Sequence, residues 1–192
     1  PLDGSFENLG ILLDKISLEL PAVEDSVSKE VLAFTALLSG ARDISDVNGF
    51  LSRITNEVKL LKRIPELYRM LPLIVEKAHR LDFDAEFLRR ASIRLGGLSL
   101  VYFYLKSTPL LEEKARTEVA ESMKLSAEKI GVFNTAPEPL LKGADLLLMG
   151  LKPGPRIGEI IRAEFEHQLQ GKILSREDAL LFARTAISSE TA

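Results

Sequence analysis

Residues 143–180 read GADLLLMGLKPGPRIGEIIRAEFEHQLQGKILSREDAL, and this stretch decides the fold. Its first apolar residues predict a short helix that stops at Gly150, where glycine ends a helix at little cost. After Pro153-Gly154-Pro155, apolar residues recur at helical spacing up to a second stop at Gly171. The stretch therefore predicts two helices joined by a tight Pro-Gly-Pro turn.

The same helical spacing extends in both directions from this stretch. Ser175, followed three residues later by Asp178, resembles a capping box that opens a final helix. Period-two alternation bounded by turn signals, the pattern of strands, is absent from the sequence. Pro65 and Pro72 interrupt the pattern between residues 56 and 81, which favours two or three short helices there. Other helices are predicted over residues 5–18, 28–38, 45–54, 85–106 and 108–132, with Ser45 and Thr108 as caps.

We therefore predict an all-α fold, an irregular multi-helix array that ends in a helix-turn-helix hairpin with a Pro-Gly-Pro turn. Pro137 and Pro139 cannot both lie inside a helix, so residues 134–139 are expected to form a connector. The connector divides the chain into a helical region over residues 1–133 and a smaller, tail-like helical region over residues 134–192.

Composition excludes several classes of chemistry. The 192 residues include no cysteine, which rules out disulfides, zinc–thiolate sites and thiol catalysis. The two histidines, His79 and His167, form no paired metal-binding motif, so no metal site is expected. The longest nearly apolar stretch, residues 95–105, is too short to cross a bilayer, and no signal segment is evident. We expect a cytoplasmic protein without a membrane partner.

Charge is distributed unevenly along the chain. The formal net charge of −3 argues against a nucleic-acid partner, because such partners are bound by neutralising phosphates. Residues 53–94, however, contain 10 basic and 6 acidic side chains. The basic side chains of this segment that we consider as RNA-binding candidates are Arg53, Lys59, Lys62, Arg63, Arg89, Arg90 and Arg94. The alternative is a pair of solvated helix faces that bind nothing.

The Pro-Gly-Pro turn carries a second candidate site. Pro155 fits the first turn of a helix, so the amides that follow it have no carbonyl partner within the helix. Free amides at a helix N-terminus attract anions, and a phosphate group fits such a site. The predicted phosphate-binding residues are Lys152, Gly154, Arg156, Ile157 and Gly158. A helical hairpin without a ligand would show the same pattern.

These residues also carry a family resemblance. The runs DLLLMGLKPGPRIGEII (145–161), QLQGKI (168–173) and SREDAL (175–180) resemble the C-terminal signature of bacterial tRNA nucleotidyltransferases and poly(A) polymerases. Residues 45–63 and 88–105 resemble the helical neck and body of the same enzymes more loosely.

The resemblance implies a role in substrate binding. Family members hold tRNA by its acceptor and T arms while an N-terminal head adds nucleotides to the 3′ end, using magnesium and ATP or CTP. The nucleotide-binding loop and the carboxylate pair of that head have no counterpart here. We read Asp82-Phe83-Asp84 as a helix cap. This chain alone is therefore expected to be catalytically silent and to bind no cofactor, with tRNA or another RNA 3′ end and the catalytic head as its partners.

Two alternatives from other classes stay open. The chain could be a helical scaffold or oligomerisation module that binds no RNA of its own. An independent enzyme is disfavoured, because no cluster of nucleophile, base and metal ligands can be assembled from the sequence. The activity of the parent protein, CCA addition or A addition, is not decided by these residues.

Overall fold

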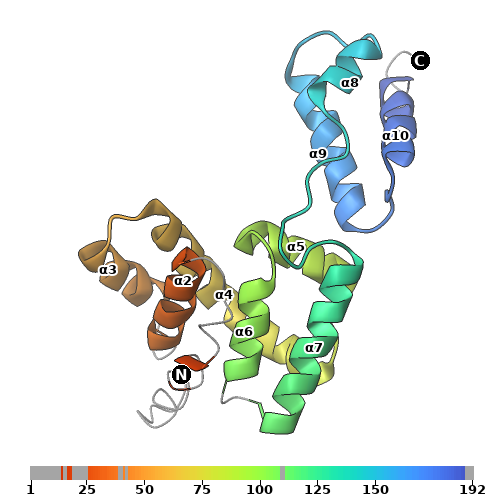
Figure 1. The fold of residues 1–192 in the computed structure, drawn as a ribbon. Helices are drawn as coiled ribbons and strands as arrows, with labels where there is room; N and C mark the ends of the chain where they lie inside the picture. Colours follow the sequence, from red (N-terminus) through yellow and green to blue (C-terminus); the bar gives the residue numbers. More distant parts are fainter. Residues whose placement is uncertain are drawn as a thin grey trace.

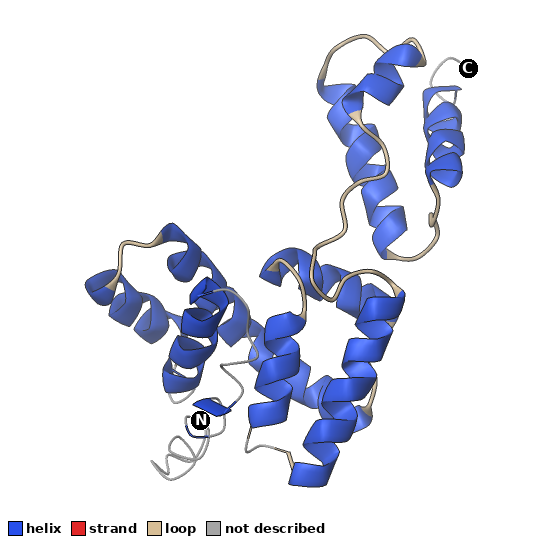
Figure 2. Cartoon of the chain, viewed as in Figure 1, coloured by secondary structure: helices blue, strands red, loops and turns tan. Residues whose placement is uncertain are grey.

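Helices joined by loops account for the described residues, with no strand among them (Figure 2). The structure is a computed structural model and describes residues 14, 17, 18, 26–38, 41, 43–108 and 111–188. The helices are α2 (Ser26–Leu37), α3 (Ile44–Ile54), α4 (Val58–Arg80), α5 (Ala85–Leu95), α6 (Ser99–Ser107), α7 (Glu113–Lys129), α8 (Gly143–Leu148), α9 (Pro155–Leu169) and α10 (Arg176–Ser188). The all-α fold class is confirmed. The helix predicted over residues 5–18 lies largely outside the described residues.

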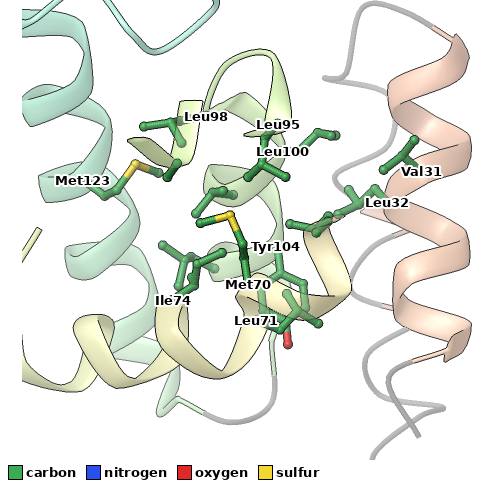
Figure 3. Close-up of a cluster of buried hydrophobic side chains, with 14 of the residues drawn as sticks. Val31, Leu32, Met70, Leu71, Ile74, Leu95, Leu98, Leu100, Tyr104 and Met123 are labelled. Atoms are coloured by element: carbon green, nitrogen blue, oxygen red, sulfur yellow. The ribbon is translucent and has the colours of Figure 1, made fainter. Parts of the chain in front are cut away.

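The larger of two hydrophobic clusters lies among α2–α7 (Figure 3). Leu32 of α2, Ile74 of α4 and Tyr104 of α6 are fully buried in it, and Met123 of α7 lies in the same cluster. Burial of a side chain of this size contributes roughly 1.5–3 kcal/mol. This packing fixes α4 and α5, the helices that carry the basic side chains.

One continuous helix, α4, replaces the two or three short helices predicted between residues 56 and 81. Pro65 and Pro72 both lie inside it. A proline in a helix interior costs about 3 kcal/mol because it removes a hydrogen bond and clashes with the preceding turn. Residues that recur every three or four positions along α4 are nevertheless buried, from Leu60 to Ala78. Burial of this long apolar stripe outweighs the cost of the two prolines.

Two helices replace the single long helix predicted over residues 85–106. Gly96 ends α5 in a left-handed conformation (φ 74°), and its amide donates to the Ser92 carbonyl at 2.7 Å. Gly97 has φ 125°, and a β-carbon there would lie 2.8 Å from backbone atoms of Asn134. The loop that follows α7 therefore packs directly on this glycine. Gly96 and Gly97 therefore lie in a loop. The prediction of one helix over residues 85–106, which would have placed them inside it, is wrong.

Several predicted helix starts are displaced. Asp43, not Ser45, caps α3, because its carboxylate accepts from the Ser45 amide at 2.8 Å and the Asp46 amide at 3.1 Å. Thr108 ends α6 instead of opening the next helix, and α7 begins at Glu113. Pro109, the other half of that predicted start, lies outside the described residues.

The smaller hydrophobic cluster belongs to α8–α10, which Figure 1 shows set apart from α2–α7 at the end of an extended connector. Its buried members are Leu141, Leu146, Ile160, Ile173, Ala179 and Ala183. The capping box at the start of α10 is confirmed, because the Ser175 and Asp178 side chains each accept from the other's amide, at 3.1 and 3.2 Å. The division of the chain at residue 134 into two regions stays a prediction.

Candidate functional site

The turn between α8 and α9 contains the five predicted phosphate-binding residues. Gly150 takes a left-handed conformation (φ 91°) just after α8, and Pro155 is the first residue of α9. Gly154 has extended backbone (φ 168°), which any residue can adopt. Of these two glycines, Gly150 is the one in a left-handed conformation, while the Pro-Gly-Pro turn itself stays a prediction. Residues 152–155 are all exposed to solvent.

The first turn of α9 presents an open surface. A β-carbon added at Gly158 would meet no atom within 4 Å, and one at Gly154 would touch just the Lys152 carbonyl at 4.0 Å. The Ile157 amide, however, donates to the Gly154 carbonyl at 3.3 Å. One of the amides that follow Pro155, which were expected to be free, is thus engaged in a long hydrogen bond. Close approach of a ligand backbone to the two glycines is sterically allowed.

Charge at this turn is partly balanced within the helix. The Arg156 guanidinium lies 3.1 Å from the Glu159 carboxylate, one turn further along α9. An ion pair this exposed contributes less than about 1 kcal/mol to stability. Replacing the Glu159 carboxylate by a phosphate as the partner of Arg156 would therefore cost little free energy. Lys152 is exposed beside it. Whether these residues bind phosphate stays a prediction.

Other residues of the family-like motif hold the tail together. The Arg176 guanidinium contacts the Asp145 carboxylate at 2.6 Å and donates to the Leu140 carbonyl at 3.0 Å. Asp145 also accepts from the Lys142 amide at 2.8 Å, which caps α8. These two side chains join α8, α10 and the connector. Their place in the motif is explained by structure and needs no ligand.

The seven basic candidates of residues 53–94 separate into two groups. Lys59, Lys62 and Arg63 of α4 and Arg94 of α5 line one pocket of about 410 Å³, which we call the α4–α5 pocket. Its other lining residues are Ile93, Leu95 and Gly96. Spacing of three and four residues places the three α4 side chains on one helix face, which sequence could indicate. The contribution of Arg94 depends on how α5 packs against α4, and the sequence alone could not indicate that packing.

The remaining three candidates lie outside this pocket and have partners within the chain, as Arg63 of the pocket also does. Arg53 donates to the Gly49 carbonyl of its own helix at 2.9 Å. Arg89 donates to the Leu169 carbonyl at the end of α9, at 3.2 Å. Arg90 donates to Glu86 at 2.9 Å and also contacts Glu166 of α9.

Arg89 and Arg90 therefore connect α5 to α9. We call their contacts with Leu169 and Glu166 the α5–α9 clamp. Contact with Arg90 lowers the pKa of the Glu166 carboxyl. No pattern around Glu166 in the sequence pointed to this pairing, since its partner lies 76 positions away.

The acidic residues that precede α5 have structural roles. Asp84 caps α5 by accepting from the Phe87 amide at 2.8 Å, which lowers the pKa of its carboxyl. The Lys77 ammonium lies 3.0 Å from Asp82 and 2.9 Å from Asp84. Within the described part of the chain, no three His, Cys, Asp or Glu side chains gather closely enough to hold a metal ion. The helix-cap interpretation of Asp84 is confirmed.

Comparison with known proteins gives a partial match. A stretch of 50 residues, 26% of this chain, is 42% identical to an A-adding tRNA nucleotidyltransferase from Deinococcus radiodurans and covers 12% of that protein's length. No family model and no solved structure matches the chain. The match supports the resemblance to tRNA nucleotidyltransferases over about a quarter of the chain. None of the helices formed by the described residues is long and apolar enough to cross a membrane.

Proposed function

We propose that this chain is the RNA-binding C-terminal region of a tRNA nucleotidyltransferase of the CCA-adding or A-adding group. It holds the acceptor and T arms of tRNA through phosphates while a catalytic head, in another part of the parent protein, extends the 3′ end. The head would bind magnesium and ATP or CTP, and the residues described here take no part in that chemistry.

The observation that carries the proposal is the α4–α5 pocket. Four basic side chains from two helices converge there, although the chain as a whole has a net charge of −3. Local concentration of positive charge attracts a polyanion and releases its counterions, which favours binding. RNA duplexes are recognised largely through shape and backbone, so no base-reading side chain is required. The open first turn of α9 supplies a second place for a phosphate.

Salt-dependent binding to tRNA tests the proposal. We expect the chain to bind tRNA in a fluorescence anisotropy titration, with an affinity that falls steeply as salt is raised. The double substitution Lys59→Ala and Lys62→Ala should weaken binding and lower the salt slope by about 2, since two phosphate contacts are lost. Lys152→Ala with Arg156→Ala should act in the same way if the tail turn binds a phosphate.

A matched control separates site-specific contacts from net charge. Lys114 and Lys129 are exposed on α7, outside both candidate sites. Replacing both with alanine removes the same charge and should leave the affinity nearly unchanged. Absence of tRNA binding at low salt would refute the proposal for this chain. A stable oligomer indifferent to RNA, seen by light scattering, would instead favour the scaffold interpretation.

A further inference from the structure

The α4–α5 pocket is a concave site. A site that binds the backbone of an unbroken duplex does not need to be concave. It is an open hollow of about 410 Å³ between the exposed Lys59 and Lys62 on α4 and Arg94 at the end of α5. Cavities of this size accept small-molecule ligands. A phosphodiester inside a duplex has sugars on both sides and lies on a convex ridge, whereas a chain end can enter a cavity. A terminal group can therefore reach the basic side chains that line this hollow.

Arg63 has unused hydrogen-bonding capacity beside this pocket. Its two terminal nitrogens donate to the Ser28 hydroxyl at 3.4 Å and the Leu95 carbonyl at 3.5 Å, both at the outer limit for hydrogen bonds. Its Nε is buried and finds no acceptor among the described residues. A buried donor without an acceptor is unfavourable, so an incoming anion with several oxygens can recruit this guanidinium from its weak contacts.

The charge of the pocket exceeds what one phosphodiester neutralises. Four of its seven lining residues are basic and, within the described part of the chain, the other three carry no charge. Glu66 is the first acidic residue after Arg63 along α4. Its carboxylate lies 2.6 Å from the Arg69 guanidinium, with which it pairs. A phosphate monoester carries about 1.5 to 2 negative charges at pH 7 and three acceptor oxygens. It matches this cluster better than a singly charged diester.

We propose that the α4–α5 pocket binds a terminal phosphate monoester, and that this group is the 5′-phosphate of the bound RNA. The assignment to the 5′ end rests on the proposed function, because an RNA that is extended at its 3′ end must carry a free hydroxyl there. Arg63 and Arg94 contact the phosphate oxygens, and Lys59 and Lys62 contribute charge at the rim.

The test compares one RNA with two different 5′ ends. An acceptor-stem hairpin is prepared with a 5′-phosphate or, after phosphatase treatment, with a 5′-hydroxyl, and anisotropy titrations with the full chain are run at the same salt. We expect the phosphorylated RNA to bind about tenfold more tightly, since a charge-assisted hydrogen bond is gained. Arg94→Gln and Arg63→Gln should each remove the preference. Arg94 is exposed, so its variant tests the site even if Arg63→Gln disturbs folding.

Controls distinguish this inference from the proposed function. Lys114→Gln removes one positive charge from α7, outside both candidate sites, and should keep the preference for the 5′-phosphate. Equal affinity of the wild-type chain for both RNAs would overturn the 5′-phosphate assignment and leave RNA binding intact. No binding of either RNA would overturn both. If the two RNAs bind equally while a free nucleoside 5′-monophosphate raises the melting temperature in an Arg94-dependent way, the ligand is a free phosphate monoester and the RNA-end assignment is wrong.

Discussion

Glu164 is the buried carboxyl group of the tail. It lies on α9 with no exposed surface, and neither oxygen forms a hydrogen bond of regular geometry within the described part of the chain, although the backbone of Leu141 and Leu140 lies close to it. Burial raises the pKa of Glu164 above its ordinary value of 4.5, and the nearby backbone of Leu141 and the charge of His167 offset the increase in part. The polar environment is thus near enough to act electrostatically without satisfying the carboxylate. Folding therefore shifts this carboxyl group toward its protonated form relative to the unfolded chain.

This raised pKa predicts how stability depends on pH. An acid whose pKa is higher in the folded state stabilises the fold fully below its unfolded pKa, near 4.5, and the contribution is lost as pH rises through the folded pKa. Glu164→Gln removes the buried charge and should stabilise the chain at pH 7 by about 1 kcal/mol, the lower end of the cost of an unsatisfied buried group. Thermal unfolding between pH 4 and pH 8 measures the effect, with the exposed Glu177→Gln as control. Parallel pH profiles for wild type and Glu164→Gln would contradict the prediction.

Among the helices, those whose starts and stops are encoded locally were predictable. Pro155 at the first position of α9 and the reciprocal pair of Ser175 and Asp178 act within one turn of the chain, so the sequence alone identifies them. The continuity of α4 across Pro65 and Pro72 was not predictable, because packing against other helices outweighs local propensity.

The residues of the candidate site also differ in whether local sequence could predict their positions. The face shared by Lys59, Lys62 and Arg63 follows from helical spacing, and the position of the tail turn follows from its prolines. Two other features depend on contacts between different helices. Arg94 of α5 lies beside that face of α4 in the pocket, and Arg90 contacts Glu166 of α9. Charge density in the sequence could not separate arginines that line the α4–α5 pocket from arginines that bridge two helices of the chain.

The break between α5 and α6 gives a prediction at the scale of elements. Gly96 and Gly97 both have positive φ, but a β-carbon at Gly96 meets no atom within 4 Å, whereas one at Gly97 overlaps the Asn134 backbone at 2.8 Å. Gly96→Ala should cost about 1 kcal/mol from the left-handed conformation alone. Gly97→Ala should cost about 3 kcal/mol or more, because backbone atoms cannot move aside as a side chain can. Urea unfolding of the two variants gives the comparison, and equal losses of stability would show that the 133–134 loop does not pack on Gly97.

At the scale of the whole molecule, the α5–α9 clamp is a direct contact between the larger cluster and the tail. Besides the connector, Arg89 and Arg90 of α5 join the larger cluster to α9 through the Leu169 carbonyl and the Glu166 carboxylate. The two candidate phosphate sites belong to different helices, one between α4 and α5 and one at the start of α9. If both sites bind phosphate, contacts that hold α9 against α5 would lower the entropy cost for one RNA to reach both.

Glu166→Gln tests whether Arg90 holds the tail or binds RNA. The substitution removes the charge that pairs with Arg90 and makes the chain more basic by one unit. If Arg90 were an RNA-binding residue, its release and the added positive charge would both tighten binding to tRNA. If the clamp positions the tail, affinity should instead fall several-fold, because the effective concentration of the second site is lost. Small-angle scattering should then show a larger radius of gyration than for Glu177→Gln, which removes the same charge from α10. If Glu166→Gln binds RNA more tightly and its radius of gyration is unchanged, Arg90 is an RNA-binding residue and the clamp interpretation is wrong.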